Sequence, residues 1–284
     1  MYNIIVANEG NQQLVFNDLD GDYQITTIEG LYPADALINT DQAAYLDGGR
    51  YNSSKVNMRT INFGFSIEKN PEEARRQVYR VLQPKRSIKL YYTSKLYDVF
   101  IEGYVINVNV AHFEKKQTVT FQMLCPFPYF KRAQLIVNDL TAIAGRFHFP
   151  FAIPEAGQAF GEIVSVPSSF IPNEGMIETG IIIELYAKAP LSNIKVYNYD
   201  TQKYIGVNAD MVAGDLITIT TGQGEKTITL LREGETKNIF NQIMEGSTWL
   251  QLPADGMTAI YTVQEGLYTD LIVSIMHYDL YEGV

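Results

Sequence analysis

The feature that most constrains the fold is a two-residue alternation of apolar and polar side chains that recurs along the chain. In residues 61–67 the odd positions are large and apolar, and the even positions are polar or small. Residues 118–123 repeat the pattern, and in 104–110 the apolar set is Tyr104, Ile106, Val108 and Val110. Because successive side chains of a β-strand point to opposite faces, this period indicates half-buried strands. We therefore expect a mainly β protein built from antiparallel sheet.

One segment, residues 70–82, has the period of a helix instead. Asn70 is a residue type that caps helices, Pro71 suits the first helical position, and Glu73 has the spacing of a capping box. Pro84 ends the segment, and an apolar stripe runs along one side of it, formed by Ala74, Val78, Val81 and Leu82. We expect one helix, packed against an N-terminal β-sandwich.

A proline-rich stretch, Cys125–Arg132, separates two parts of different charge. Its two prolines, Pro126 and Pro128, cannot both lie inside a sheet, because each removes a backbone donor. Residues 1–132 carry 15 basic and 14 acidic residues, and residues 133–284 carry 7 and 18. We therefore predict two domains, 1–132 and 133–284, with Cys125–Arg132 as a stiff exit strap between them.

The second part reads as a run of short strands separated by turn signals. Candidate strands occupy residues 146–153, 176–188, 194–199, 215–220, 226–232, 248–252, 259–263 and 271–278. Strands at this spacing favour a sandwich of jelly-roll type. Residues 238–245 could add one or two helical turns, and residues 31–55 of the first part, rich in Pro, Asp, Gly and Ser, are expected to form a long loop.

No pattern of residues points to catalysis, to a cofactor or to a metal. His112, His148 and His277 are far apart, and no nucleophile or zinc motif accompanies them. Cys125 is the only cysteine and is expected to be buried and inert, with folding in a reducing cytoplasm. Asp18–Asp22 partly matches a calcium loop, but Tyr23 stands where that loop needs glycine, so we expect a turn. We predict a protein without enzymatic activity.

Charge and hydropathy exclude two classes of partner. The net charge is −10 and the basic clusters are pairs, so we expect no recognition of nucleic acid. No stretch approaches the ~20 apolar residues of a membrane span, and the first ten residues do not resemble a secretion signal.

Aromatic residues leave two interpretations open. Trp249 and the 19 tyrosines could stack on sugar rings, which makes a glycan-binding module that recognises host cell-wall polysaccharide the alternative function. Tyr91, Tyr92 and Tyr97 are candidate contacts with another subunit, and packing within the domain is the other interpretation of them.

The order of several short motifs resembles the distal tail protein (Dit) family of long-tailed, non-contractile phages. The motifs are Ile28–Pro33, Asp47-Gly48, Ser53, Arg59, the helix with Arg75 and Val78-Tyr79, Ile101–Tyr104, Cys125–Phe130, Gly214–Ile219 and Lys226–Ile228.

This resemblance implies a structural component of the virion tail tip, assembled in the host cytoplasm. Members form a hexameric ring through the N-terminal domain, between the major tail tube protein and the tail-associated hub or lysin protein. The C-terminal domain, galectin-like or sandwich-like in the family, faces outward and can hold a receptor-binding protein. The resemblance thus implies a baseplate hub for host attachment.

Overall fold

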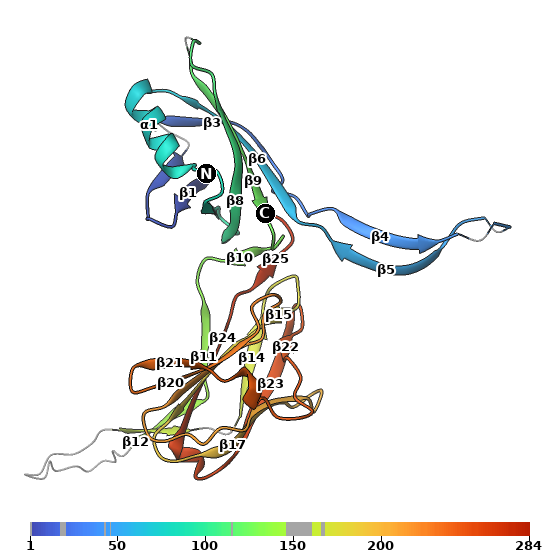
Figure 1. Cartoon of the computed structure of the whole chain (residues 1–284), viewed down its shortest axis with the longest axis vertical. Helices are drawn as coiled ribbons and strands as arrows, with labels where there is room; N and C mark the ends of the chain where they lie inside the picture. The colour runs from blue at the N-terminus through green and yellow to red at the C-terminus, as the bar shows by residue number, and fades with distance from the viewer. Residues whose placement is uncertain are drawn as a thin grey trace, which may run out of the picture. The chain divides into compact units, whose positions relative to one another are not determined.

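The chain folds into two compact units, one of which contains the other in sequence. The computed structural model describes residues 2–17, 21–42, 44–45, 47–114, 116–145, 161–165 and 168–284. The first unit consists of residues 1–134 together with Leu280–Val284, and the second of Leu135–Asp279 (Figure 1). The expected range 133–284 therefore differs from the observed second unit at its end, because the last five residues lie in the first unit. Asp18–Asp20, from the candidate calcium loop, lie outside the described residues.

The first unit is built on an antiparallel sheet with the order β2-β1-β7-β8-β9-β6-β3. Strand β10 pairs with β8, and β25 pairs with β10. Its strands are β1 Asn3–Asn8, β2 Gln13–Asn17, β3 Tyr23–Glu29, β6 Arg59–Ile67, β7 Ser87–Thr93, β8 Asp98–Val110, β9 Thr118–Cys125, β10 Phe130–Arg132 and β25 Leu280–Tyr281. The predicted strand at 61–67 is thus confirmed as the main part of β6, and the one at 118–123 as β9.

Aromatic side chains bring the two ends of this sheet together around one core. Phe16 of β2 lies 5.7 Å from Tyr23 of β3 and 4.9 Å from Phe65 of β6, measured between ring centroids. Phe63 stacks on Phe121 at 5.2 Å. Because β2 and β3 are the outermost strands of the path, these contacts curl the sheet around its apolar face.

Helix α1, Pro71–Val81, covers this core as the sequence predicts. Ala74, Val78 and Val81 are buried, and the hydroxyl of Tyr23 donates to the Ala74 carbonyl at 3.0 Å. The predicted capping is wrong in its detail. Asn70 has φ 48°, in the left-handed region, and its side chain makes no capping hydrogen bond.

Strand β8 corrects the phase of the predicted alternation in 104–110. Val105 is buried, whereas Tyr104 and Ile106 are about half exposed. The register to β9 shifts between Val105 and Asn107, so Ile106 is the extra residue of a β-bulge. A bulge moves the following side chains to the other face. The predicted alternation was therefore wrong for Tyr104 and Ile106, whereas Val108 and Val110, after the bulge, pack against the core as predicted.

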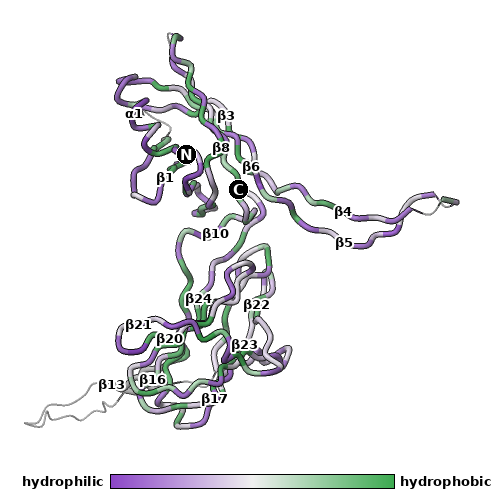
Figure 2. The backbone as a smooth tube through the Cα atoms, in the orientation of Figure 1, coloured by the Kyte–Doolittle hydropathy of each residue, from purple (hydrophilic) through white to green (hydrophobic). Residues whose placement is uncertain are grey.

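The expected loop at 31–55 is instead mostly a hairpin. Strand β4, Ala36–Asp41, pairs with β5, Arg50–Val56, and neither pairs with the main sheet. In Figure 1 this hairpin, which we call the arm, projects away from the sheet of its own unit. Figure 2 colours most of β5 hydrophilic. Without a buried face the arm has no apolar alternation, so the sequence pattern missed it.

The proline-rich stretch is also not an exit strap. Phe130 is fully buried in the first core, and β10 pairs with both β8 and β25. The prolines form a corner between β9 and β10 inside the first unit, and the division between units falls after Gln134.

The second unit places two main sheets on one core. One sheet has the order β11-β24-β16-β19-β20-β21 and the other β14-β23-β17-β18. All buried apolar residues of the unit form a single cluster. The strands are β11 Ile136–Asp139, β12 Thr141–Gly145, β13 Gly161–Ser165, β14 Ser168–Asn173, β15 Thr179–Gly180, β16 Ile182–Ala187, β17 Ser192–Asn198, β18 Tyr204–Val207, β19 Leu216–Thr220, β20 Thr227–Arg232, β21 Glu235–Asn238, β22 Gln251–Leu252, β23 Gly256–Glu265 and β24 Leu271–His277. The mainly β fold class is confirmed.

Several details of this unit differ from the predicted elements. Residues 238–245 contain only one 3₁₀ turn, η1 Phe240–Gln242, and a second, η2, covers Tyr268–Asp270. Residues 248–252 contribute only the two-residue strand β22. The candidate strand at 146–153 lies outside the described residues.

Candidate assembly surfaces

The described candidate catalytic side chains lie in different local surroundings. Among the residues that the structure describes, no group of three His, Cys, Asp or Glu side chains could hold a metal ion. His112 is exposed beside the Tyr79 hydroxyl, and His277 is buried with its Nε2 atom 3.4 Å from Asp279 Oδ1. His148 lies outside the described residues. Cys125 is fully buried, as expected, and burial raises the pKa of its thiol to about 12, which leaves it a poor nucleophile.

Arg59, at the start of β6, connects β6 with three other segments of the first unit. Its Nε atom donates to the Pro128 carbonyl at 2.6 Å, and Nη1 donates to the carbonyls of Gly30 at 2.6 Å and Tyr32 at 2.5 Å. Nη2 donates to the Glu282 carbonyl. We call Arg59 and these four carbonyls the arginine clamp. A guanidinium suits this position because it offers five donors in a rigid plane.

Arg59 is buried, so its guanidinium needs all of its hydrogen-bond partners. The side chain is only 2% exposed, and its Cζ atom lies 4.8 Å from the centre of the Phe130 ring. Burial lowers the pKa of the guanidinium, so the four carbonyls replace the solvation that it has lost. Gly30 approaches so closely, with φ 91°, that a Cβ atom there would lie 2.3 Å from the Thr60 carbonyl oxygen. The clamp gives a structural role to residues of the proline-rich stretch, Pro128 and Phe130, and of the 28–33 motif, Gly30 and Tyr32.

The arm presents its side chains to solvent along its whole length. All residues of β4 and all but the last of β5 are exposed. Cross-strand bonds tie the two strands together, with Asn39 Nδ2 donating to Ser53 Oγ at 3.0 Å. Among its described residues, the exposed large apolar or aromatic side chains are Leu37, Ile38, Tyr45 and Tyr51. An exposed apolar surface of this kind typically marks an interaction site.

The predicted contact tyrosines lie close together but do not share one surface. Tyr92 and Tyr97 pack against the first core, and Tyr97 lies 5.6 Å from Tyr281. Tyr91 is half-buried, 5.7 Å from the Phe100 ring. The structure gives all three a packing role within the unit. Contact with a second subunit stays a prediction for them.

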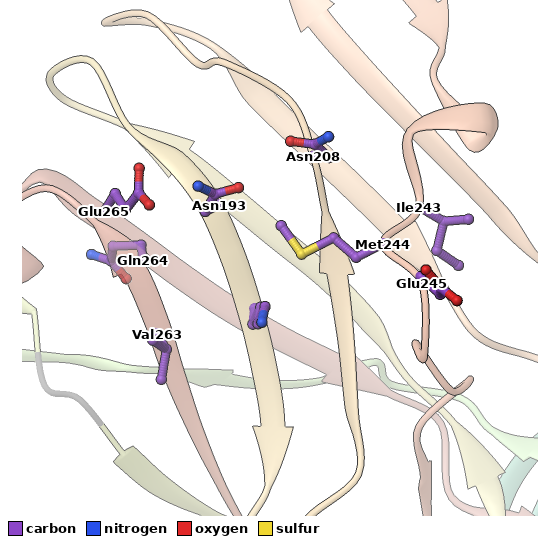
Figure 3. Close-up of a pocket in the computed structure, with 9 residues that line it drawn as sticks. Asn193, Asn208, Ile243, Met244, Glu245, Val263, Gln264 and Glu265 are labelled. Carbon is purple, nitrogen blue, oxygen red and sulfur yellow. The ribbon is translucent and has the colours of Figure 1, made fainter.

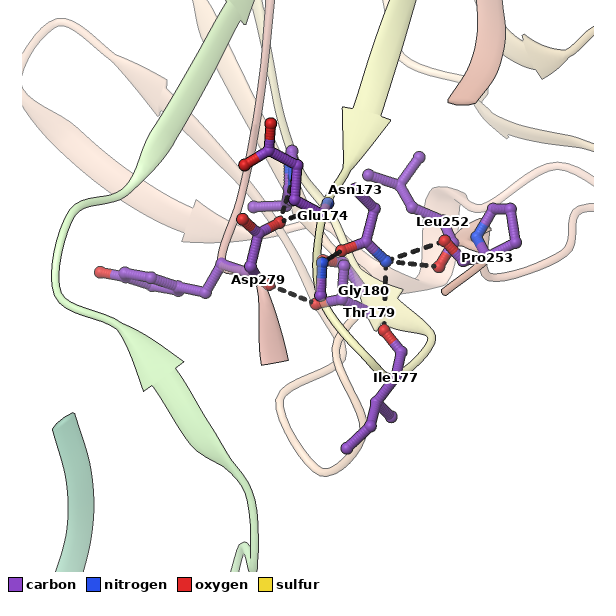
Figure 4. Close-up of polar contacts among 11 residues, drawn as sticks. Asn173, Glu174, Ile177, Thr179, Gly180, Leu252, Pro253 and Asp279 are labelled. Carbon is purple, nitrogen blue, oxygen red and sulfur yellow. Dashed lines mark hydrogen bonds and ion pairs between the residues drawn. The ribbon is translucent and has the colours of Figure 1, made fainter. Parts of the chain in front are cut away.

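In the second unit, Asn173 at the end of β14 organises a buried polar node (Figure 4). Its Nδ2 atom donates to the carbonyls of Ile177 and Pro253, at 3.1 and 2.9 Å. Its Oδ1 atom accepts from the Gly175 amide at 2.9 Å. Next to it, the Glu174 amide donates to Asp279 Oδ1 at 3.2 Å. The node satisfies backbone groups of two loops, β14–β15 and β22–β23, which is a structural task.

Trp249, the predicted glycan contact, has neighbours on its ring. It stacks on Phe240 at 5.6 Å, Lys226 Nζ lies 5.4 Å from its ring centre, and it packs against the second core. These contacts favour a packing role, and glycan contact at Trp249 stays untested.

Asp215 and Arg232 form a paired ionic contact that makes the second unit sensitive to acid. Arg232 donates to the two carboxylate oxygens at 2.9 and 2.5 Å, and the Val212 amide donates at 2.8 Å. Asp215 is 1% exposed, and its hydrogen bonds with Arg232 lower its pKa below the ordinary value.

We expect Asp215→Asn to destabilise the second unit at neutral pH by about 2 kcal/mol, because one strong acceptor of Arg232 is lost. Since the folded-state pKa is lowered, the stabilisation is present above about pH 4 and lost as the pH falls through the folded pKa. Urea titrations followed by Trp249 fluorescence at pH 7 and pH 3 would measure this. A difference between wild type and variant that does not shrink at pH 3 would contradict it.

Sequence reasoning missed two features that the structure brings forward. The arm has no buried face, so only its turn residues, Asp47 and Gly48, gave a signal. The strand β25 is two residues long and pairs with β10, which lies near the middle of the chain. Nothing local could show that pairing.

Comparisons with known proteins bear on both units. Residues 174–271 match the family model of the siphovirus-type tail component, C-terminal domain. No protein of curated function matches the chain significantly. No helix within the described residues is long and apolar enough to cross a bilayer.

Solved structures resemble the chain over its whole length. The Dit protein of phage SPP1, described as a paradigm of the hub adsorption apparatus in phages infecting Gram-positive hosts, matches with a TM-score of 0.68 at 12% identity, over 98% of both chains. A chain of the phage P2 baseplate in its activated conformation with calcium gives 0.55 at 15% identity, over 100% of this chain and 99% of that one. The same baseplate with strontium gives 0.54 at 12%, over 100% of each chain. The chain therefore has the fold of a phage distal tail protein and carries, in residues 174–271, the C-terminal domain of the siphovirus-type tail components.

Proposed function

We propose that this chain is a non-enzymatic hub protein of a phage tail tip. In this proposal six copies form a ring that joins the major tail tube protein to the tail-associated hub or lysin protein and presents a receptor-binding protein. The fold it shares with a hub protein over 98% of both chains supports this role. The dispersed histidines and the inert Cys125 agree with a protein that does no chemistry.

The observation that carries the ring is the arm. An isolated two-stranded hairpin is at best marginally stable in water, yet β4 and β5 pair with each other alone. Contact with a neighbouring subunit would cover Leu37, Ile38 and Tyr51. It would also give the two-stranded hairpin a surface to pack against. Because the arm differs from the surface that would receive it, such a contact runs head to tail and can close a ring.

The test is the mass and the symmetry of the purified protein. We expect native mass spectrometry to give six times the chain mass of 32.1 kDa. Negative-stain images should show a six-fold ring with a central channel. A species that stays monomeric at every concentration would contradict the ring.

The place in the virion needs its own experiment. We expect antibodies against the second unit to label the end of the tail, and a tail tube protein and a hub or lysin protein to co-purify with the ring. Labelling along the whole tube would contradict the hub role even if the ring forms. Assembly in the host cytoplasm agrees with a chain whose one cysteine is unpaired.

A further inference from the structure

The four-stranded sheet of the second unit carries an open groove on its outer face (Figure 3). The groove has a volume of about 500 Å³ and lies between β17, β23 and the segment Ile243–Glu245. Its size falls in the range of small-ligand sites. Its apolar part is formed by Ile243, Met244 and Val263.

A β-bulge shapes one side of the groove. The register between β17 and β23 shifts between Ser192 and Lys195, and Asn193 within the bulge has φ 54°. Bulges re-aim side chains and are common beside binding sites. Here the bulge brings the Asn193 amide to the groove opposite Gln264 of β23.

Backbone contacts fix the other side. The backbone N–H of Met244 donates to the Gly206 carbonyl at 2.9 Å. The backbone N–H of Asn208 donates to the Gln242 carbonyl at 2.8 Å. The Tyr204 hydroxyl donates to the Glu245 carbonyl at 2.6 Å. The groove is therefore largely preformed, which lowers the entropic cost of binding.

The polar groups of the groove fit a ligand that both donates and accepts hydrogen bonds. Three are amides, two are carboxylates and one is an ammonium group: Asn193, Asn208, Gln264, Glu245, Glu265 and Lys195. Within the described part of the chain, the Oε1 atom of Gln264 is buried and accepts no hydrogen bond, while its Nε2 atom donates to the Leu267 carbonyl at 3.4 Å. Because that oxygen is closed to solvent, the amides that a ligand can reach directly are the exposed ones, Asn193 and Asn208.

Charge decides between ligand classes. One lysine against two glutamates gives the groove a formal charge of −1. Lys195 Nζ also lies 4.9 Å from the Tyr204 ring centre, so part of its charge is already engaged. A phosphate-rich or sulfated polymer would meet repulsion here, whereas an uncharged polyol would not.

A row of tyrosines extends the site along the sheet. Tyr204, Tyr197 and Tyr261 come from neighbouring strands, with ring centroids 5.1 and 5.0 Å apart. They share the outer face with Lys195, because Ile194 and Val196 on the other face are buried in the core. Half-buried tyrosine rings give apolar area and hydroxyl groups at low conformational cost. The groove and the row together suit a chain of several rings.

We propose that this groove, with the adjacent tyrosine row, binds a neutral oligosaccharide. The amides and Glu245 or Glu265 bond its hydroxyls, and its apolar ring faces pack on Met244 and Val263. The tyrosines, whose rings face one another, offer ring edges and hydroxyl groups. The proposal moves glycan binding away from Trp249. It does not rest on ring formation, since all of its residues belong to the second unit.

The test uses the full-length protein on an array of neutral, sulfated and phosphorylated oligosaccharides. The groove variant is Asn193→Gly with Asn208→Ala; glycine keeps the positive φ of residue 193 free of strain. The control is Gln223→Ala, an exposed amide in the turn between β19 and β20 of the same unit. We expect wild type and control to bind neutral members and the groove variant to bind them at least about tenfold more weakly.

A second variant keeps the test decisive if the first one unfolds. Lys195→Met retains a long apolar stem beside Tyr204 but removes the charge. We expect it to weaken neutral binding by less than about tenfold, through one lost hydrogen bond. Binding confined to anionic members and lost with Lys195→Met would overturn the proposal, as would a wild type that binds no neutral member. Neutral binding unchanged in a folded groove variant would do the same.

Discussion

A chain in which residues 38–54 are replaced by Asn-Gly should fold but fail to form the ring. The replacement joins Leu37 and Lys55, which are paired in the hairpin, by a two-residue turn of the type that closes antiparallel strands. The residues of β4 and β5 that are removed are exposed, so we expect the stability of the first unit to change by less than about 0.5 kcal/mol. Native mass spectrometry should then show the monomer alone.

The control shortens a different hairpin of the same unit, the one between β8 and β9. Replacing residues 112–117 by Asn-Gly joins Ala111 to Thr118, which are bonded across the β8–β9 turn at 2.9 Å. This variant also loses a fully exposed aromatic side chain, Phe113. It should still assemble. A ring that persists without the arm would show that the contacts lie elsewhere, with Tyr91 the next candidate.

Arg59→Met should be among the most destabilising single substitutions in the first unit. It leaves four carbonyls without their shared donor, at a cost that we place at about 4 kcal/mol. Arg59→Lys should recover only part of this, because one ammonium group cannot reach four carbonyls in a plane. The control Arg50→Met changes an exposed arginine of the arm and should cost less than about 0.5 kcal/mol.

The position of the single tryptophan makes this prediction specific. Trp249 belongs to the second unit, so its fluorescence follows that unit alone, whereas far-ultraviolet circular dichroism follows both. In urea, Arg59→Met should shift the dichroism transition of the first unit and leave the Trp249 transition in place. An equal effect of Arg59→Met and Arg50→Met on both signals would show that the clamp contributes little.

The parts of the fold that were predictable are those with a buried face. Strands β6 and β9 alternate because one side lies in the core, and α1 has its apolar stripe for the same reason. The bulge at Ile106 interrupts the alternation of β8. One extra residue reverses which side chains face the core, and nothing in the residue types shows where it lies. The arm buries no side chain of β4, and so it left only turn residues to read.

The candidate sites were harder to predict because their partners are backbone groups from distant segments. Arg59 was part of the motif pattern, yet its role depends on carbonyls of residues 30, 32, 128 and 282. The groove depends on a register shift at Asn193 that no residue type announces. Trp249 drew attention because tryptophan is a common sugar contact, whereas the groove is lined by ordinary amides.

The return of residues 280–284 to the first unit has a consequence for biosynthesis. Glu282 supplies one carbonyl of the clamp, and β25 extends the sheet at β10. During translation, Leu135–Asp279 leaves the ribosome before these residues do. The enclosed unit can therefore close while the enclosing one is still incomplete, and the first unit becomes whole only after residue 284 has emerged. The first unit, to which we assign the proposed ring contacts, is thereby the last to become complete during synthesis.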